Sequence, residues 1–289
     1  IDGLPTLSLI AQLGCPFGCG FCGGRSSPFL RRIRTRPTSK VISELHHLHH
    51  TYSTRGFMFL DDELNVSLSM VELMDAISLL QSSLSTTFRL RGFIKSELFT
   101  PQQAASMHRA GFREILVGFE SGHDRILSNI QKKATLSDNT RCVQIAHDHG
   151  LRVKALTSIG HPGESYSTVS ATRDFLLSTR PDDFDITIIT PYPGTPYYDE
   201  SLPSPPTSPL HYTYTAKSGD TLHMIDVDYL STSDYYKGVP GSYRSHVFTD
   251  HLSADDLVSL RDKVDLEVRR ELGLEDRRPV SFEHSMGQS

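Results

Sequence analysis

AQLGCPFGCGFCGGR, residues 11–25, contains three of the four cysteines in the chain and decides how the remaining sequence is interpreted. Cys15, Cys19 and Cys22 follow the spacing C-x-x-x-C-x-x-C, and glycines surround them. Three clustered thiols do not make a disulfide framework, and they are one ligand short of a closed tetrahedral metal site. In a reducing compartment such a cluster is metal-binding or catalytic, so we expect a cytoplasmic protein.

Composition narrows the class of protein. The 289 residues carry a formal net charge of −5, with 37% hydrophobic and 22% charged residues, as in ordinary globular enzymes. No polycationic footprint supports nucleic acid as a partner. No apolar run approaches the roughly 18 to 20 residues of a membrane span, so we expect no membrane partner.

Hydrophobic periodicity predicts strands that alternate with helices as far as residue 192. The expected strands are 6–13, 56–63, 86–94, 113–122, 152–160 and 183–192, and the expected helices are 38–52, 67–84, 100–111, 137–150 and 165–180. This alternation is typical of a parallel sheet covered by helices. Six units are fewer than the eight of a complete barrel of about 250 residues. We therefore predict an α/β fold, a partial (β/α)6 TIM-like barrel with a small C-terminal extension.

The chain is expected to divide into three parts. Residues 1–200 form the barrel, and 201–210 form a connector that contains the run PSPPTSP. Residues 211–289 form the extension, with a hairpin that turns at Ser218-Gly219-Asp220 and a last helix over 253–273.

Polar residues and glycines collect at the carboxyl ends of the expected strands, where ligands bind in parallel α/β folds. In chain order they are Asp61-Asp62-Glu63, Arg91, Glu120-Ser121-Gly122, the loop 160–164 and the loop 190–196. We expect these segments to converge on one rim with the thiols.

The residues around the thiols favour an iron–sulfur cluster. A zinc site needs four ligands, and the nearest histidine, His46, lies a full helix away. A thioredoxin-like interpretation of Cys19 and Cys22 leaves Cys15 unexplained. Three thiolates on a tight loop can hold three irons of a [4Fe–4S] cube, with the fourth iron open to a chelating ligand.

This motif, placed directly after a first strand and with an aromatic residue before its third cysteine, resembles that of the radical S-adenosylmethionine (SAM) superfamily. The resemblance extends over about Thr6 to Tyr198. It implies that Cys15, Cys19 and Cys22 ligate a [4Fe–4S] cluster, whose open iron binds SAM. It also implies reductive cleavage of SAM to a 5′-deoxyadenosyl radical that modifies an organic substrate, with electrons from a reductant such as flavodoxin or ferredoxin.

The same resemblance implies contacts for SAM. One of the three acidic residues at 61–63 is expected to meet the amino group, and the family's glycines are missing there, so the choice stays open. The other implied contacts are Phe21, Ile159 and Gly160 at the adenine, Glu120 and Ser121 near the ribose and methionine part, and Arg91 at the methionine carboxylate.

A finer resemblance comes from GFMFLDDELN (56–65), LVGFESG (116–122), SIGHPGES (158–165) and ITPYPGTPYYD (189–199). These segments resemble radical SAM enzymes that carry an N-terminal cobalamin-binding domain, many of which are methyltransferases or ring-modifying enzymes. The chain has no D-x-H-x-x-G cobalamin signature. Either it works without cobalamin or it is a fragment, which its non-Met start favours, with cobalamin bound outside it.

The leading hypothesis is thus a radical SAM enzyme acting on a small molecule. A radical SAM modifier of tRNA or peptide is an alternative, as is a non-catalytic iron–sulfur or zinc scaffold. Two other features are expected to be structural. Cys142 lies on an expected helix as a small core residue, and the histidines of HHLHH (46–50) lie on a solvated helix face.

Overall fold

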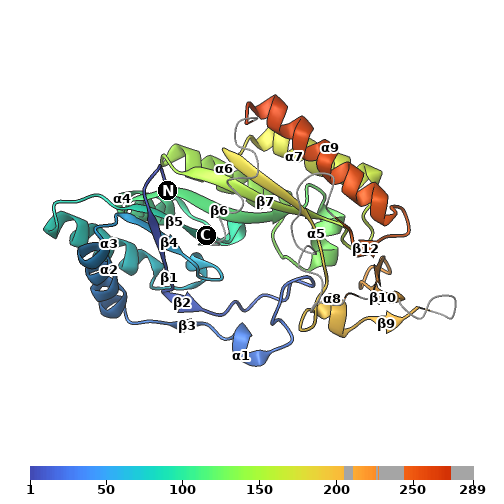
Figure 1. Cartoon of the computed structure of the whole chain (residues 1–289), viewed down its shortest axis with the longest axis horizontal. Helices are drawn as coiled ribbons and strands as arrows, with labels where there is room; N and C mark the ends of the chain where they lie inside the picture. The colour runs from blue at the N-terminus through green and yellow to red at the C-terminus, as the bar shows by residue number, and fades with distance from the viewer. Residues whose placement is uncertain (205–210, 226, 228–243, 275–289) are drawn as a thin grey trace.

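The computed structural model describes residues 1–204, 211–225, 227 and 244–274. Its largest element is a six-stranded parallel sheet with the order β1-β4-β5-β6-β7-β8 (Figure 1). These strands are β1 Thr6–Leu9, β4 Gly56–Phe59, β5 Arg89–Ile94, β6 Phe112–Glu120, β7 Arg152–Ile159 and β8 Asp183–Ile188. Their order in the sheet is their order in the chain, and the sheet does not close. The predicted partial barrel is therefore confirmed.

Helices cover the convex side of the sheet, one after another around it (Figure 1). They are α2 Thr38–Tyr52, α3 Met70–Ser83, α4 Pro101–Arg109, α6 Leu136–Asp148 and α7 Tyr166–Thr179. Capping boxes begin α4, α6 and α7, where the side chains at the N-cap and at the third helical residue satisfy each other's backbone N–H groups. Gly111 and Gly150 follow α4 and α6 with φ of +98° and +70°, the left-handed conformation that ends a helix.

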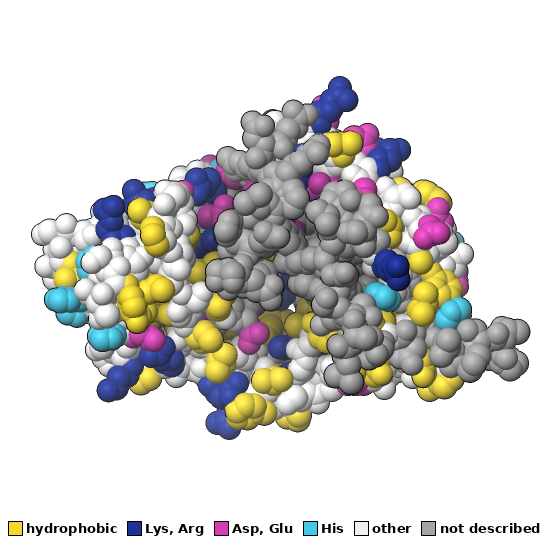
Figure 2. Space-filling view, in the orientation of Figure 1, with side chains coloured by type: hydrophobic (Ala, Val, Ile, Leu, Met, Phe, Trp, Pro, Cys, Tyr) yellow, Lys and Arg dark blue, Asp and Glu magenta, His cyan; other side chains and the backbone are white. Residues whose placement is uncertain are grey.

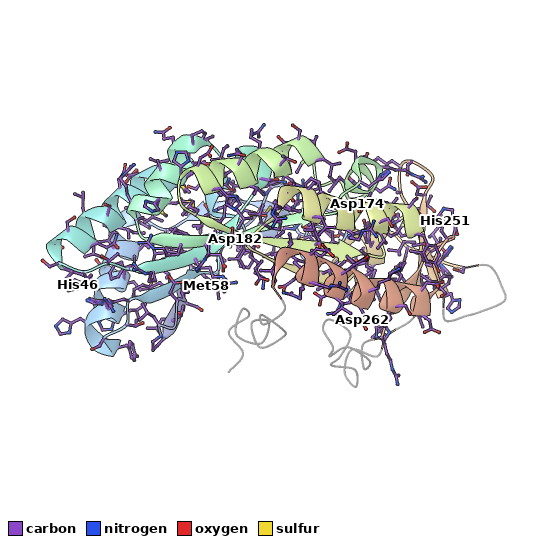
Figure 3. The ribbon with its side chains drawn as sticks, turned by 90° about the horizontal axis from the view of Figure 1, so that it is seen from above. His46, Met58, Asp174, Asp182, His251 and Asp262 are labelled. Carbon is purple, nitrogen blue, oxygen red and sulfur yellow. The ribbon has the colours of Figure 1, made fainter. Side chains whose placement is uncertain are left out.

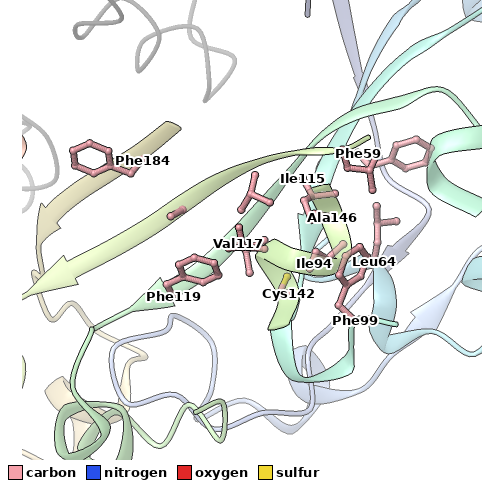
Figure 4. Close-up of a cluster of buried hydrophobic side chains, with 14 of the residues drawn as sticks. Phe59, Leu64, Ile94, Phe99, Ile115, Val117, Phe119, Cys142, Ala146 and Phe184 are labelled. Atoms are coloured by element: carbon pink, nitrogen blue, oxygen red, sulfur yellow. The ribbon is translucent and has the colours of Figure 1, made fainter. Parts of the chain in front are cut away.

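The hydrophobic core lies between the sheet and these helices. Figure 4 shows Phe59, Val117 and Phe119 of the strands beside Cys142 and Ala146 of α6, all of them buried. The sequence prediction for Cys142 is confirmed, because its side chain is fully buried among apolar neighbours.

Side chains of β5 alternate between this core and the concave face, with Leu90 and Ile94 buried and Arg89 and Arg91 half-buried. The concave face of the sheet therefore carries charged residues.

Figure 3 shows His46 at the outer end of the helical layer, and His46, His47 and His50 are exposed as expected. His49 differs, because its half-buried ring lies edge-on to Phe88 and its Nδ1 is 2.7 Å from Thr54 O.

Short elements lie between the main strands and helices. They are β2 Gln12–Leu13, α1 Pro28–Arg31, β3 Arg34–Thr35, the 3-10 turns Leu64–Val66 and Ser96–Leu98, α5 Asp124–Ile130 and α8 Pro196–Asp199. The first strand ends at Leu9 rather than at residue 13, because the pairing with β4 stops there and the amides of Ala11 and Gln12 bond to the Asp61 carboxylate instead. Periodicity alone does not indicate such an exchange of partners.

The C-terminal part forms a second, antiparallel sheet and a long helix. The sheet has the order β12-β11-β10-β9, and the helix is α9. Their bounds are β9 Leu202–Pro203, β10 His211–Thr215, β11 Thr221–Ile225, β12 Val247–Phe248 and α9 Ala254–Leu272. The predicted hairpin and last helix are thus present, and α9 packs on α7 and β8. The connector falls largely at 205–210, outside the described residues, and the three-part division stays a prediction.

The hairpin turn anchors this C-terminal sheet to the barrel. Asp220 accepts hydrogen bonds from Arg125 and from Asn129 of α5 and from Ser218, and the Arg125 guanidinium holds the pKa of Asp220 well below its usual range. The amide of Gly163, in the loop after β7, donates to Thr221 O at 3.3 Å. The extension therefore braces α5 and one rim loop. None of the described helices is long and apolar enough to cross a membrane.

Candidate active site

The loop that carries the three cysteines runs across the carboxyl ends of the strands. Cys19 is buried against Ile126 and Ile130 of α5, while Cys15 and Cys22 are half-buried. The Gly20 amide donates to Ile130 O at 2.8 Å, and Gly20 O accepts from the Tyr197 amide at 2.9 Å. The loop is thus fixed between α5 and α8.

Asp61 fixes the start of this loop. Its carboxylate accepts the amides of Ala11 at 3.1 Å and Gln12 at 2.5 Å, and the side chain is 1% exposed. Burial raises the pKa of Asp61 to about 6, although the bonded amides act in the opposite direction. Asp62 accepts the Gly14 amide at 2.7 Å, one residue before the first cysteine. Both aspartates therefore hold backbone, and Glu63 is the acidic residue of the stretch with a buried oxygen that has no described partner.

Glu63 presents an acceptor that no described group fills. Its Oε2 atom is buried without a hydrogen-bond partner, and so is Oε1 of Gln12, whose amide nitrogen donates to Glu63 O. Burial raises the pKa of Glu63 to about 7, while Lys132 and Lys95 act in the opposite direction. Two buried acceptors of this kind suit a ligand that brings its own N–H donors.

Two buried lysines lie beside the thiols. Lys132 donates to Glu120 Oε1 at 2.9 Å, and Lys95 pairs with Glu97 at 2.5 Å with its ammonium 4.2 Å from the Phe17 ring centroid. Burial alone would lower the pKa of Lys132, but Glu120, the Cys19 thiol and Glu63 outweigh it, and the pKa is raised. Each buried lysine is therefore paired with a glutamate, and this part of the rim holds both signs of charge.

The lysines act on the cysteines. Burial raises the pKa of all three thiols, that of Cys22 to about 12. Lys132 and Lys95 favour the thiolate at Cys19, as Arg25 does at Cys22. A bound cation would complete this effect, because a thiolate is the metal ligand.

Glu120 adopts a left-handed backbone conformation, with φ of +58°, where β6 ends. A bulge after Gly118 turns its carboxylate to accept from Lys132 and from Ser158 Oγ at 3.2 Å. A Cβ on Gly118 would overlap Glu120 Oε1 and lie 2.7 Å from Lys132 Nζ, so glycine makes room for the pair. Such strain in a non-glycine residue is characteristic of functional sites.

Three aromatic side chains, Phe21, His161 and Tyr197, pack together at one side of the rim. His161 is fully buried, bonds Ser158 Oγ at 2.8 Å through Nε2 and lies 3.4 Å from Tyr197 OH through Nδ1. Its ring is edge-on to Phe21, with 5.5 Å between centroids. Burial lowers the pKa of His161 to about 3, so the imidazole is neutral. Phe21 therefore lies beside His161 at the rim, and its contact with adenine stays a prediction.

Gly20 tests how tightly the cysteine loop is packed. In Gly20→Ala the new Cβ would overlap the buried Tyr197 ring, so we expect the apo chain to lose about 1–3 kcal/mol of unfolding free energy. Gly18→Ala, on the same loop, meets nothing within 4 Å and is the matched control. Thermal unfolding of both apo variants measures the difference. Equal melting temperatures would contradict the packing described.

Glu164 is a buried carboxyl in the loop after β7. It accepts from Thr168 Oγ1 at 2.5 Å, its Oε2 has no partner among the described residues, and burial raises its pKa to about 7. The unfolded chain loses this proton near the ordinary value of 4.5 and the folded chain near 7. Between these values the folded state holds the extra proton, so the free energy of unfolding falls as pH rises.

This linkage predicts the behaviour of Glu164→Gln. Relative to the unaltered protein, the variant should gain up to about 3 kcal/mol between pH 4.5 and 7, because it has no proton to lose. Denaturant unfolding of the apo chains at several pH values measures the gain. Glu72→Gln, at an exposed position on α3, is the control for the substitution itself. A constant difference for Glu164→Gln would refute the buried, protonated carboxyl.

Three further predicted contacts, Ser121, Ile159 and Gly160, lie at the carboxyl ends of β6 and β7. Ser121 is buried, and its hydroxyl accepts the His123 amide at 3.2 Å. Ile159 belongs to the hydrophobic core, and a Cβ on Gly160 would meet Val247 at 3.1 Å.

Arg91 is not among the residues gathered around the thiols. It lies three residues before the end of β5 and forms an ion pair with Glu114 at 2.7 Å. The strand ends at Ile94 as predicted, but the expected position of Arg91 near that end is corrected, because its side chain pairs with Glu114 deeper on the concave face.

The three thiols suit a cluster better than a single ion. All three are free, and the Cys22 thiol interacts electrostatically with the other two. Over the described part of the chain, no group of three His, Cys, Asp or Glu side chains is arranged to hold a metal ion. Three free thiols on one loop, each able to take one iron, match the ligand set of a [4Fe–4S] cube, whereas tetrahedral zinc needs a fourth protein ligand.

The sequence profile of the radical SAM superfamily matches residues 9–176, more than half of the chain. The chain belongs to the radical SAM superfamily. It is therefore an enzyme whose cofactors are a [4Fe–4S] cluster and SAM.

Similar curated proteins are of several kinds. An uncharacterised methyltransferase of Pyrococcus horikoshii is 31% identical over 202 residues, 70% of this chain and 43% of that protein. The bacteriochlorophyllide d C-12(1)-methyltransferase of Chlorobaculum tepidum is 25% identical over 67% of this chain and 42% of that protein's length. The anaerobic magnesium-protoporphyrin IX monomethyl ester cyclase of Rubrivivax gelatinosus is 24% identical over 65% of this chain and 33% of that protein's length. The chain thus spans less than half the length of each relative.

Solved radical SAM structures share the fold. TsrM from Kitasatospora setae, a radical SAM methyltransferase with cobalamin and a [4Fe–4S] cluster bound, has a TM-score of 0.63 at 21% identity, over 74% of this chain and 43% of that one. The cobalamin-dependent radical SAM enzyme OxsB has a TM-score of 0.52 at 17% identity, over 59% of this chain and 26% of that one. The predicted likeness to the cobalamin-associated group is confirmed.

Sequence reasoning missed several residues of the radical SAM rim. Lys95 directly follows an apolar strand, a signal that was available, but Lys132 and Gln12 belong to no motif. Glu164 and His161 belong to the loop 160–164 that the sequence places at the rim, and the structure adds that both, like Tyr197, are fully buried.

Proposed function

We propose that Cys15, Cys19 and Cys22 hold the cluster, that SAM completes it, and that the enzyme modifies a small organic molecule. The observation that carries this proposal is the set of three free thiols on one loop beside the buried cations Lys95 and Lys132. When bound and reduced, the cluster supplies one electron that cleaves SAM to methionine and a 5′-deoxyadenosyl radical.

The side chains of this chain bind and orient SAM. Glu63 Oε2 and Gln12 Oε1, both without a described partner, are proposed to accept from the amino group. Lys95 and Lys132, which the chain pairs with Glu97 and Glu120, are proposed to donate from their ammonium groups to the methionine carboxylate as well. Arg91 is too far down the strand to take this role.

The adenine is proposed to lie by Phe21 and the backbone of Ile159 and Gly160. The buried His161 and Tyr197 keep water from that side of the rim. Glu120 and Ser121 are kept as contacts for the ribose and methionine part. Asp61 and Asp62 are assigned to holding the loop rather than SAM, because their carboxylates accept backbone amides.

The subclass we favour is methyl transfer with cobalamin bound outside this chain. Support comes from the P. horikoshii and C. tepidum methyltransferases and from the fold shared with TsrM. The C. tepidum and R. gelatinosus relatives, by their names, act on bacteriochlorophyllide d and magnesium-protoporphyrin IX monomethyl ester, which supports a small-molecule substrate. A flavodoxin or ferredoxin as reductant, a cytoplasmic location and the division at 200 and 210 complete the proposal.

Anaerobic reconstitution with iron and sulfide tests this function. The protein should turn brown, bleach with dithionite and form 5′-deoxyadenosine from SAM. Added cobalamin with a methyl acceptor should then yield S-adenosylhomocysteine if methyl transfer is the subclass. A colourless protein with stoichiometric zinc would refute the function. A brown protein that forms no 5′-deoxyadenosine would refute its catalytic part.

A further inference from the structure

The stretch around the cysteine loop has a charge opposite to that of the whole chain. Residues 3–43 contain no Asp or Glu and six basic residues, although the net charge of the chain is −5. Five of the six are arginines, at 25, 31, 32, 34 and 36. A local field of this sign attracts negatively charged partners and weakens with added salt.

This basic segment packs directly on the loop that carries the thiols. Leu30 O, in α1, accepts the Cys15 amide at 3.2 Å, and the Arg31 guanidinium donates to Pro16 O at 3.1 Å. Arg25 donates to Cys15 O. A partner seated on α1 therefore lies within a few residues of a proposed cluster ligand.

The same segment exposes apolar side chains at its centre. Phe29 is 62% exposed, Leu13 44% and Leu30 42%, while Arg34 lies 3.8 Å over the Phe29 ring. Figure 2 shows Lys/Arg and hydrophobic side chains adjoining along the lower edge of the molecule, where Figure 1 places α1. We call the group Leu13, Phe29, Leu30, Arg31, Arg32 and Arg34 the arginine face. An apolar centre with a charged rim is the usual anatomy of a protein interface.

Acidic side chains near the arginine face are already engaged. Asp62 accepts the Gly14 amide, Glu44 pairs with Arg36, and Asp199 accepts from Ser26 Oγ at 2.7 Å. Arg31 and Arg32 are exposed. Neither guanidinium forms an ion pair with a described residue, and Arg31 donates only to the Pro16 carbonyl oxygen, so both charges are open to a partner.

We propose that the arginine face is the docking site for a small acidic one-electron carrier of the flavodoxin or ferredoxin class. The proposal rests on the proposed function, since the electron goes to the cluster on Cys15, Cys19 and Cys22. One electron leaves the reduced carrier, which is oxidised by one unit, and the cluster passes from the [4Fe–4S]2+ to the [4Fe–4S]1+ state. An electron carrier needs a small, salt-sensitive interface close to the cluster that accepts its electron. The arginine face has exposed positive charges, and it contacts the loop that carries the thiols.

Two variants separate docking from catalysis. Arg32→Glu reverses one exposed charge and Phe29→Ser removes the apolar centre, and neither side chain is assigned to the cluster or SAM. Arg270→Glu on α9 and Leu79→Ser on α3 are matched controls at exposed positions far from α1. Stopped-flow absorbance follows bleaching of the reconstituted cluster by a reduced acidic flavodoxin at increasing concentration and at two salt concentrations. Dithionite, which needs no docking surface, is the second reductant.

At low salt, each docking variant should lower the apparent second-order rate constant of cluster reduction by flavodoxin about tenfold. At high salt, the rate constant of Arg32→Glu should lie closer to that of the unaltered protein. Their dithionite-driven 5′-deoxyadenosine formation should equal that of the unaltered protein and of the controls. Flavodoxin rates that match the controls would overturn the proposal. Equal losses with both reductants would also overturn it, because the face would then belong to the cluster site. A dimer that dissociates in the variants would assign the face to a second copy instead. If the proposed function itself is wrong, the result is different, because the unaltered protein then forms no 5′-deoxyadenosine even with dithionite.

Discussion

Replacing Cys19 with alanine should abolish formation of 5′-deoxyadenosine, a loss of at least about a thousandfold. Cys19 is the most buried of the three loop thiols and the one on which Lys95 and Lys132 both act. With two thiolates left, a [4Fe–4S] cube has too few protein ligands to be retained. Iron and sulfide content after anaerobic reconstitution should fall with the activity.

Cys142→Ala is the matched control for this prediction. Cys142 is equally a buried free cysteine, but it lies in the core beside Ala146 on α6 (Figure 4). Its replacement removes one sulfur atom from the packing and should cost about 1 kcal/mol of stability, with the cluster retained. Loss of the cluster in Cys142→Ala, or its retention in Cys19→Ala, would contradict the assignment of the ligands.

Replacing Lys132 with methionine should lower the unfolding free energy by about 3 kcal/mol at pH 8. The variant leaves Glu120 buried without its cation, and removing one partner of a buried pair is more costly than losing both. Denaturant unfolding of the apo chain measures the loss. The midpoint potential of the reconstituted cluster should also become more negative, since a positive charge beside Cys19 is gone.

Two further variants isolate the ion pair. Lys133→Met changes the neighbouring exposed lysine and should stay within about 0.5 kcal/mol of the unaltered protein. The double variant Lys132→Met, Glu120→Gln should recover most of the stability, because no uncompensated charge is left. A double variant no more stable than Lys132→Met would show that packing, not charge, explains the loss.

The pattern of strands and helices could be predicted from sequence because each strand is one apolar run between turn signals. The partial barrel followed from counting these units, and Gly111 and Gly150 mark helix ends in both the sequence and the structure. The short helix α5 was missed. It has seven residues, about two turns, which is shorter than the window over which helical periodicity is recognised, although Ile126 and Ile130 share the face that packs on Cys19.

The site was less accessible to sequence reasoning. Asp61, Asp62 and Glu63 look alike in sequence, and only the path of the chain at Ala11 and Gln12 decides which carboxylate is used by backbone amides. Arg91 resembles a rim cation until the sheet register places it opposite Glu114. Lys132 is brought to the thiols by the loop after α5, a tertiary arrangement with no local signal.

The paramagnetic signal of the dithionite-reduced cluster, recorded with and without SAM, tests the central claim most directly. If three thiolates leave one iron for SAM, the reconstituted protein should give the spectrum of a reduced [4Fe–4S] cluster, and SAM should shift its g values. Cys142→Ala should behave in the same way. A cluster spectrum that SAM leaves unchanged, or a protein that forms no cluster, would contradict the account.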